Sequence, residues 1–412
     1  MSFVKDTQYY KFCSYGLIKN LRFYEPFMVL FFMSIKMSYF QIGILFGIRE
    51  IVRNILEIPS GVISDTLGRR KTMMFSFATY AVSFILFFFS SSFLFFTISM
   101  SIFAIGDAFR TGTHKAMIFA YLEKHNWRQY RSDYYGRTRS CSQMGSAISA
   151  LLAAMLLLFS SELRYIFLFS AIPAIADFFL IRSYPRWLDG ETVPLNARLI
   201  RRQFKHQFHE LLSTLSRKDT VKAVLNLSVF SGFYRAIKDF VQPLIKQLAI
   251  GIPVLVTLSD EDKTTIFTGG VYFLFFLISS RVSRHSQLLI KVFKKAANAM
   301  NYTLLLAALI IATGGIFAIR NVFVAGIIAF FLIFIMENMR NPIGTAYVSN
   351  RFDDAILSGA LSANSQIKSL AAAIIAPLFG YLADTFSLGW ALVGSGLLLI
   401  PIWVTTRVKA LD

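Results

Sequence analysis

Apolar stretches of roughly 20 residues recur along the whole chain, separated by short polar segments. A helix of that length crosses the hydrocarbon core of a bilayer, since it rises about 1.5 Å per residue. Backbone groups in lipid must be paired within the segment, which favours helices, and the alternation typical of membrane β-barrels is absent from the sequence. The pattern predicts an all-α membrane protein with twelve transmembrane helices, at about 12–33, 39–63, 72–91, 93–119, 138–159, 163–183, 222–247, 264–280, 298–318, 322–347, 358–382 and 386–405.

Basic residues are distributed unevenly among the loops. With the N-terminus inside, the outward loops hold only Lys36, Lys263 and Arg320, and the other basic loop residues face the cytoplasm. The positive-inside rule therefore predicts cytoplasmic N- and C-termini in an inner or plasma membrane. The longest connection, 184–221, separates an N-terminal six-helix bundle (1–183) from a C-terminal one (222–412). It reads equally well as a basic amphipathic helix on the inner leaflet and as a solvated linker.

The two predicted bundles repeat each other. The fourth span carries Asp107-x-x-Arg110, and the tenth carries Glu337-x-x-Arg340. The fifth and eleventh spans share a Ser-Gln pair at the same distance from a glycine, and the first and seventh share Phe-Tyr followed by a charged residue. These matches predict two pseudo-symmetric halves that share one site.

Composition excludes several classes of protein. Of 412 residues, 55% are hydrophobic and 16% are charged, whereas soluble domains carry about 25% charged residues. The net charge of +19 arises mainly from the inward loops, so it does not indicate nucleic-acid binding. Two cysteines within or beside apolar runs give neither a disulfide framework nor a metal site. The first apolar run lacks a cleavage site, so we expect no cleavable signal peptide.

A glycine- and charge-rich loop follows the second span. It reads Gly61-x-x-x-Asp65-x-x-Gly68-Arg69-Arg-Lys, and this pattern resembles the signature loop of the major facilitator superfamily. The resemblance implies alternating access and a gating role for Gly61, Asp65, Gly68 and Arg69, with Arg69 paired to an acid of the fourth helix, either Asp107 or Glu123. The alternative is that the basic residues Arg69, Arg70 and Lys71 act only as topology determinants, which keep this loop on the cytoplasmic side of the membrane. The chain departs from the family pattern in two places: the arginine usual in the fourth helix of the family is missing from 99–103, and the G-P-x-x-G-G signature of many proton-coupled exporters is missing from 145–154. The second departure weakens the assignment to the exporter branch.

Ionisable residues inside the spans carry the functional signal. Eleven basic and seven acidic residues lie away from the span ends, and each costs about 2.5–3.5 kcal/mol at the bilayer centre. We expect them to face one another or a watery cavity. The predicted substrate-binding residues are Arg22, Tyr24, Glu25, Tyr234, Arg235 and Lys238; the predicted proton-coupling residues are Glu25 and Glu50; and the gate would further include Asp107, Arg110, Glu337 and Arg340. The alternative is a set of static ion pairs, such as Glu50 with Arg53 and Asp239 with Arg235 or Lys238.

These features predict a secondary transporter. The interior excess of basic residues favours a small polar, anionic solute, with the proton as coupling ion. A proton-coupled multidrug exporter of the same superfamily is the alternative, in which Glu25 and Glu50 attract cations. We expect no enzymatic activity, since no catalytic cluster or phosphate-binding loop is present in the sequence, and no cofactor. The expected partners are the solute, the proton and the lipid bilayer, with the protein acting as a monomer.

Overall fold

A computed structural model describes residues 4–160, 162–190, 205, 218–253, 257–282, 287–351 and 354–409. In these ranges the regular structure is helical, without strands. Eight helices are long and apolar enough to cross a membrane: 69–89, 93–124, 133–160, 165–182, 296–319, 323–349, 362–385 and 388–405. The predicted all-α membrane fold is confirmed, while the total of twelve spans stays a prediction.

The described residues form two compact units. The first contains residues 1–27, 52–202 and 268–277, and the second contains 28–51, 203–267 and 278–412. Helix α3 (Tyr39–Leu67) is continuous and contributes to both, as does α12 (Asp260–Val282). The division into six-helix halves at 184–221 remains a prediction, and the basic segment 198–212 lies outside the described residues apart from Lys205.

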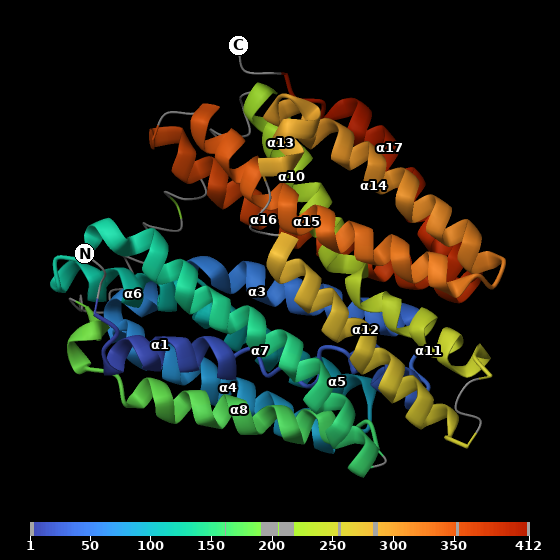
Figure 1. Cartoon of the computed structure of the whole chain (residues 1–412), viewed down its shortest axis with the longest axis horizontal. Helices are drawn as coiled ribbons and strands as arrows, with labels where there is room; N and C mark the ends of the chain where they lie inside the picture. Colours follow the sequence, from blue (N-terminus) through green and yellow to red (C-terminus); the bar gives the residue numbers. More distant parts are fainter. Residues whose placement is uncertain are drawn as a thin grey trace. The chain divides into compact units, whose positions relative to one another are not determined.

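In the first unit, long helices lie side by side (Figure 1). Helix α4 packs against α5 and α8, and α1 packs against α7. A Cβ built on Gly145 of α7 would collide with the Leu17 carbonyl of α1, so a glycine is needed for this close approach. The helices of this unit are α1 (Thr7–Ile18), α4 (Arg69–Phe89), α5 (Phe93–Arg110), α6 (Thr113–Lys124), α7 (Arg131–Ser160) and α8 (Tyr165–Arg182).

In the second unit, α14 packs against α15 and α17, and α10 packs against α15 and α16. Small residues bring these helices together: a Cβ on Gly396 of α17 would lie 2.7 Å from the Ala308 carbonyl of α14. The helices that belong wholly to this unit are α2 (Met28–Ser34), α10 (Lys218–Ile237), α11 (Val241–Gly251), α13 (Gln287–Phe293), α14 (Ala296–Ile319), α15 (Phe323–Arg351), α16 (Asp354–Thr385) and α17 (Leu388–Thr405).

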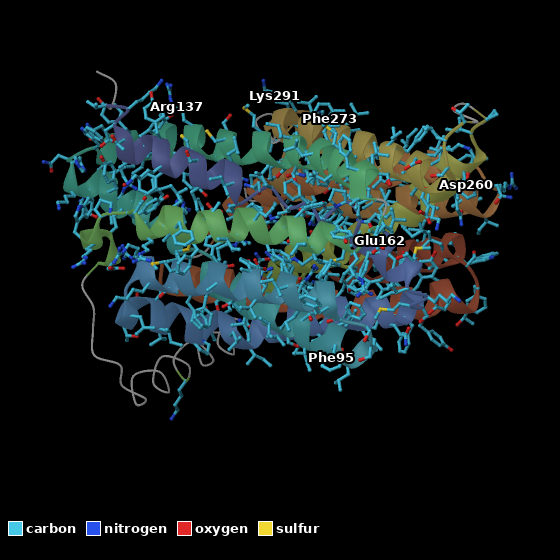
Figure 2. All side chains as sticks on the ribbon, turned by 90° about the horizontal axis from the view of Figure 1, so that it is seen from below. Phe95, Arg137, Glu162, Asp260, Phe273 and Lys291 are labelled. Carbon is cyan, nitrogen blue, oxygen red and sulfur yellow. The ribbon has the colours of Figure 1, made fainter. Side chains whose placement is uncertain are left out.

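Large apolar side chains cover the outside of the helices (Figure 2). Phe95 of α5 points outward and is 56% exposed, and Phe89 at the end of α4 is 71% exposed. Apolar exposure along spanning helices fits a lipid solvent, because hydrocarbon is as apolar as these side chains. The charged side chains of Glu50, Asp107 and Arg340, described below, lie in the interior of their units, with exposures of 1–17%.

Candidate functional site

The first predicted span is broken near its middle, which differs from the continuous helix expected over 12–33. Helix α1 ends at Ile18, and α2 begins at Met28. Pro26 lies in the break and has no backbone N–H for a helical hydrogen bond. The backbone N–H of Tyr24 instead donates to the Ser170 hydroxyl of α8 at 3.2 Å.

The predicted residues of the first span lie in this break. Arg22 and Glu25 form an ion pair at 3.6 Å, with side chains 32% and 17% exposed. The Tyr24 ring packs against Phe84 and Phe103, with centroids 5.2 and 5.5 Å away. The charged pair is therefore partly open, while Tyr24 is held by packing.

The seventh predicted span is broken in a similar way. Helix α10 ends at Ile237, a 3-10 turn covers Lys238–Phe240, and α11 begins at Val241. Pro243 cannot donate to the carbonyl four residues earlier, but it is tolerated in the first turn of a helix. Lys238 and Asp239 form an ion pair at 3.3 Å within the turn, which is one of the static pairs foreseen from the sequence.

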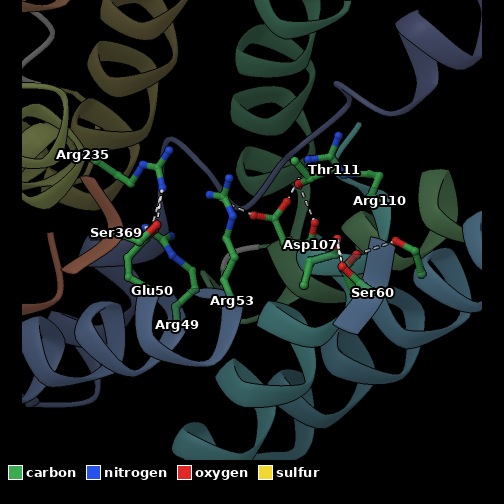
Figure 3. A network of polar contacts seen from close by, with 12 residues as sticks. Arg49, Glu50, Arg53, Ser60, Asp107, Arg110, Thr111, Arg235 and Ser369 are labelled. Atoms are coloured by element: carbon green, nitrogen blue, oxygen red, sulfur yellow. Dashed lines mark hydrogen bonds and ion pairs between the residues drawn. The ribbon is translucent and has the colours of Figure 1, made fainter. Parts of the chain in front are cut away.

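A cluster around Asp107 lies in the first unit (Figure 3). Arg110 of α5 donates to the Asp107 carboxylate at 2.8 Å, and Arg53 of α3 lies 3.4 Å from its other oxygen. The Tyr80 hydroxyl of α4 donates to Asp107 at 2.9 Å and accepts from Arg110 Nε at 3.0 Å. Three helices are thus joined through one carboxylate, which we call the Asp107 cluster (Arg53, Tyr80, Asp107 and Arg110).

A second cluster surrounds Glu50 in the second unit (Figure 3). Arg235 of α10 donates to Glu50 at 2.7 Å, and its guanidinium also donates to the Ser369 hydroxyl of α16 at 3.4 Å. Arg49, next to Glu50 on α3, lies 3.4 Å from the other carboxylate oxygen. We call these residues (Arg49, Glu50, Arg235 and Ser369) the Glu50 cluster.

Both clusters bring two guanidinium groups to one carboxylate. Each named set therefore has a formal charge of +1, and its arginine side chains are only 13–19% exposed. A guanidinium has five N–H donors in a planar fork that fits carboxylate and phosphate groups. This arrangement is suited to holding an additional anion.

The residues predicted for the gate on the tenth span have different contacts from their counterparts on the fourth. Asp107 and Arg110 pair directly, whereas Glu337 accepts a hydrogen bond from Ser231 at 3.0 Å. Arg340 is 1% exposed and donates to the Asn226 carbonyl at 2.8 Å. The sequence repeat thus places equivalent charges in unlike surroundings.

The motif loop is organised around an acid that the sequence analysis missed. Gly68 has φ of +93° and begins α4, and a Cβ there would lie 2.8 Å from the Asp189 side chain. Asp189 accepts from the Arg70 backbone at 2.9 Å and from the Arg70 side chain at 3.4 Å. Asp65 is exposed, and within the described part of the chain a Cβ on Gly61 would meet nothing within 4 Å, so no neighbouring helix requires a glycine there.

The two acids expected to pair with Arg69 are engaged elsewhere. Asp107 belongs to its own cluster, and Glu123 pairs with Arg128 and Arg131. Asp189 ends the 3-10 turn Arg186–Asp189, which lies outside every predicted span, so the pattern of charges within the spans does not include it. Arg49 and Arg53 belong to the Glu50 and Asp107 clusters but not to the predicted site; their one-turn spacing from each other on α3 is the signal that the sequence offers.

The helices, their membrane-spanning length and their interior charge clusters define a multi-pass membrane transport protein. The sequence pattern that describes the Major Facilitator Superfamily matches residues 13–296, and the chain belongs to this family. It is 21% identical over 411 residues to "Uncharacterized MFS-type transporter YxaM" of Bacillus subtilis (strain 168), covering 96% of this chain and 95% of that protein.

Solved structures share the fold. A mutant of the nucleoside transporter NupG matches with a TM-score of 0.76 at 10% identity, over 97% of both chains. A D-xylose-proton symporter matches with a TM-score of 0.68 at 16% identity, over 98% of this chain and 99% of that one. At these identities the likeness extends to the fold, and the substrate must be argued from this chain's own residues.

Proposed function

We propose that this transporter moves a small polar, anionic solute by alternating access, with the proton as coupling ion. The observation that carries the proposal is the pairing of two arginines with one carboxylate in the Asp107 cluster and again in the Glu50 cluster. Guanidinium groups bind carboxylate and phosphate groups in a planar fork, and basic residues outnumber acidic ones eleven to seven within the predicted spans, so we favour a ligand that is an anion.

The helix breaks support the same residues as binding groups. Discontinuous helices in transporters expose backbone polar groups and charged side chains near the middle of the membrane. Arg22 and Glu25 lie in the first break, and Tyr234, Arg235 and Lys238 lie at or one turn before the second. We assign substrate contact to these residues, and proton coupling to Glu25 and Glu50. The motif loop, Asp107, Arg110, Glu337 and Arg340 would then control access.

The alternative is a proton-coupled multidrug exporter, in which Glu25 and Glu50 attract a lipophilic cation. Both carboxylates already have arginine partners, at 3.6 Å for Glu25 and 2.7 Å for Glu50. Such pairing weakens their attraction for a cation and favours the anion. We further propose that both termini face the cytoplasm, that the protein works as a monomer, and that it transports without enzymatic chemistry.

A thermal-shift panel tests the anionic substrate. Purified protein would be heated with small carboxylates, phosphorylated metabolites or lipophilic cations, since a ligand of the folded form raises its apparent stability. We expect stabilisation by a subset of anions that is lost in Arg235→Ala and kept in Arg320→Ala, which removes an exposed loop arginine. Stabilisation by lipophilic cations alone would overturn the proposal in favour of the exporter.

A double variant separates ligand binding from a static ion pair. Glu50→Gln/Arg235→Gln removes both charges of the 2.7 Å pair while preserving much of its volume. We expect a folded protein that no longer responds to the anions. An unchanged anion response would show that the Glu50 cluster serves the fold only.

A further inference from the structure

Asp177 of α8 is a buried carboxyl group with no hydrogen-bond partner. The residue is 0% exposed, and neither carboxyl oxygen accepts a hydrogen bond from the part of the chain that the structure describes. Buried polar side chains are nearly always bonded, so this one needs a physical explanation. It was counted among the intramembrane acids but was assigned no role from the sequence.

The charged groups that act on Asp177 are Lys19 at the end of α1 and Arg110 of α5. In the part of the chain that the structure describes, neither cation lies within 4 Å of the Asp177 carboxylate as an ion pair. Arg110 is engaged by Asp107 at 2.8 Å, and the Lys19 ammonium lies over the Tyr15 ring, 5.5 Å from its centroid. Both cations therefore stabilise an ionised Asp177 only from a distance.

The other titratable groups that act on Asp177 are tyrosines. Tyr15 comes from α1, and Tyr184 follows the end of α8. Burial holds the pKa of Tyr184 well above its usual range, so this phenol brings no charge. Within the described residues, α4 and α7, which also pack against α8, bring no charged group that acts on Asp177. An unbonded carboxylate here would be desolvated without direct compensation, whereas a protonated carboxyl group is neutral.

We infer that Asp177 is a proton-binding site of this transporter, that it carries its proton in the conformation described, and that Lys19 couples this proton to an anionic solute. The coupling to a solute rests on the proposed function, and the protonation of Asp177 does not. When the proton leaves, the Lys19 ammonium on its flexible stem turns toward the new carboxylate. When an anion binds Lys19, the Lys19 ammonium no longer stabilises the ionised Asp177 carboxylate, and Asp177 takes up a proton.

This competition fixes the sign of the coupling. An anion that draws Lys19 away raises the proton affinity of Asp177, and by linkage the proton raises the anion affinity by the same factor. Lys19 is suited to the role because the cations Arg22, Arg110 and Arg139 also act on it, which makes its surroundings attractive to an anion. Proton and anion therefore bind together and move in the same direction. A cationic solute would instead compete with the proton and exchange for it.

Infrared spectroscopy of the full-length protein in lipid tests the protonation directly and needs no solute. A protonated carboxyl group has a carbonyl stretch that an ionised carboxylate lacks. We expect this band at pH 7 in the wild type, its loss in Asp177→Asn, and its retention in Asp133→Asn, which changes an exposed aspartate paired with Arg137 at 2.9 Å. A band that is absent from the wild type, or unchanged in Asp177→Asn, overturns the site.

A second variant leaves Asp177 intact and tests the coupling to Lys19. In Lys19→Met the cation that favours the ionised form is gone, so we expect the band to titrate about one pH unit higher than in the wild type. An unmoved midpoint removes Lys19 from the mechanism. Neither infrared measurement uses a solute. If no anion stabilises the protein in the thermal-shift panel, the proposed substrate class is rejected, while the proton site at Asp177 is still decided by the infrared spectra.

Discussion

Arg340 is predicted to hold the second unit together. It is the largest fully buried side chain among the described residues, and it lies on α15 with its guanidinium against α10 and α14. Nε donates to the Thr303 hydroxyl at 3.1 Å, and Nη2 donates to the carbonyls of Asn226 and Met300 at 2.8 and 3.3 Å. The Phe230 ring lies 4.5 Å from the guanidinium carbon.

Truncation to alanine removes all of these contacts at once. A hydrogen bond from a charged group contributes about 1.5–3 kcal/mol, and each buried acceptor left unpaired costs about 1–3 kcal/mol. Removing the buried cation also relieves its own desolvation, so the terms partly cancel. We therefore expect Arg340→Ala to lower the free energy of unfolding by about 2–5 kcal/mol, the range seen when a large buried side chain is truncated to alanine.

The assay is thermal unfolding of the purified protein in detergent at one fixed scan rate, because unfolding of such a protein is governed by rate as well as equilibrium. A loss of that size lowers the apparent midpoint by about 10 °C. Arg320→Ala is the control, since this exposed loop arginine should change stability by less than about 0.5 kcal/mol. If Arg340→Ala unfolds at the temperature of the control, the anchoring argument is wrong, and a loss of transport at that unchanged temperature would leave Arg340 with the access role alone.

Three further predictions concern the loop and the carboxylates. Gly68→Ala should destabilise the first unit by about 1–3 kcal/mol, because a positive φ and the nearby Asp189 side chain both oppose a Cβ; an unchanged thermal midpoint would contradict this. Glu25→Gln should abolish pH-driven uptake in proteoliposomes while solute exchange or binding persists, and unaltered pH-driven uptake rejects its coupling role. Asp65→Asn should slow turnover more than it weakens solute binding, and kinetics with the opposite pattern would remove Asp65 from the gate.

The fold class was predictable because bilayer thickness sets helix length. Eight spans are apolar enough to be found by hydropathy in the described residues, and their bounds lie within a few residues of the prediction at most ends. The first, second, seventh and eighth predicted spans fall short of that criterion. The first of these is interrupted, since α1 and α2 are 12 and 7 residues long, whereas α3 is a continuous helix of 29 residues that contains Arg49, Glu50, Arg53 and Glu57.

The helix breaks were not predictable in the same way. Pro26 and Pro243 mark where a helical hydrogen bond is lost, but a proline inside a membrane helix often leaves only a kink. What allows the backbone to leave helical geometry after Ile18 is a partner elsewhere: Ser170, 146 residues away, accepts from the Tyr24 backbone. The Val29 N–H at the start of α2 likewise donates to the buried Gln242 side chain at 2.8 Å. Such contacts arise only in the folded chain.

The partners of the charged residues were likewise predictable only where they lie close together in the sequence. Sequence spacing placed Asp107 with Arg110 correctly, because residues three apart on a helix are neighbours. It could not show that Arg340, at the equivalent repeat position, turns to buried backbone carbonyls. Repeated charges therefore predict where polar groups lie, while the surrounding helices decide whether they bind a ligand, carry a proton or hold the fold. In the second unit, Arg340 donates to a buried backbone carbonyl, whereas Arg235 pairs with Glu50 at 2.7 Å and has a side chain that is 19% exposed.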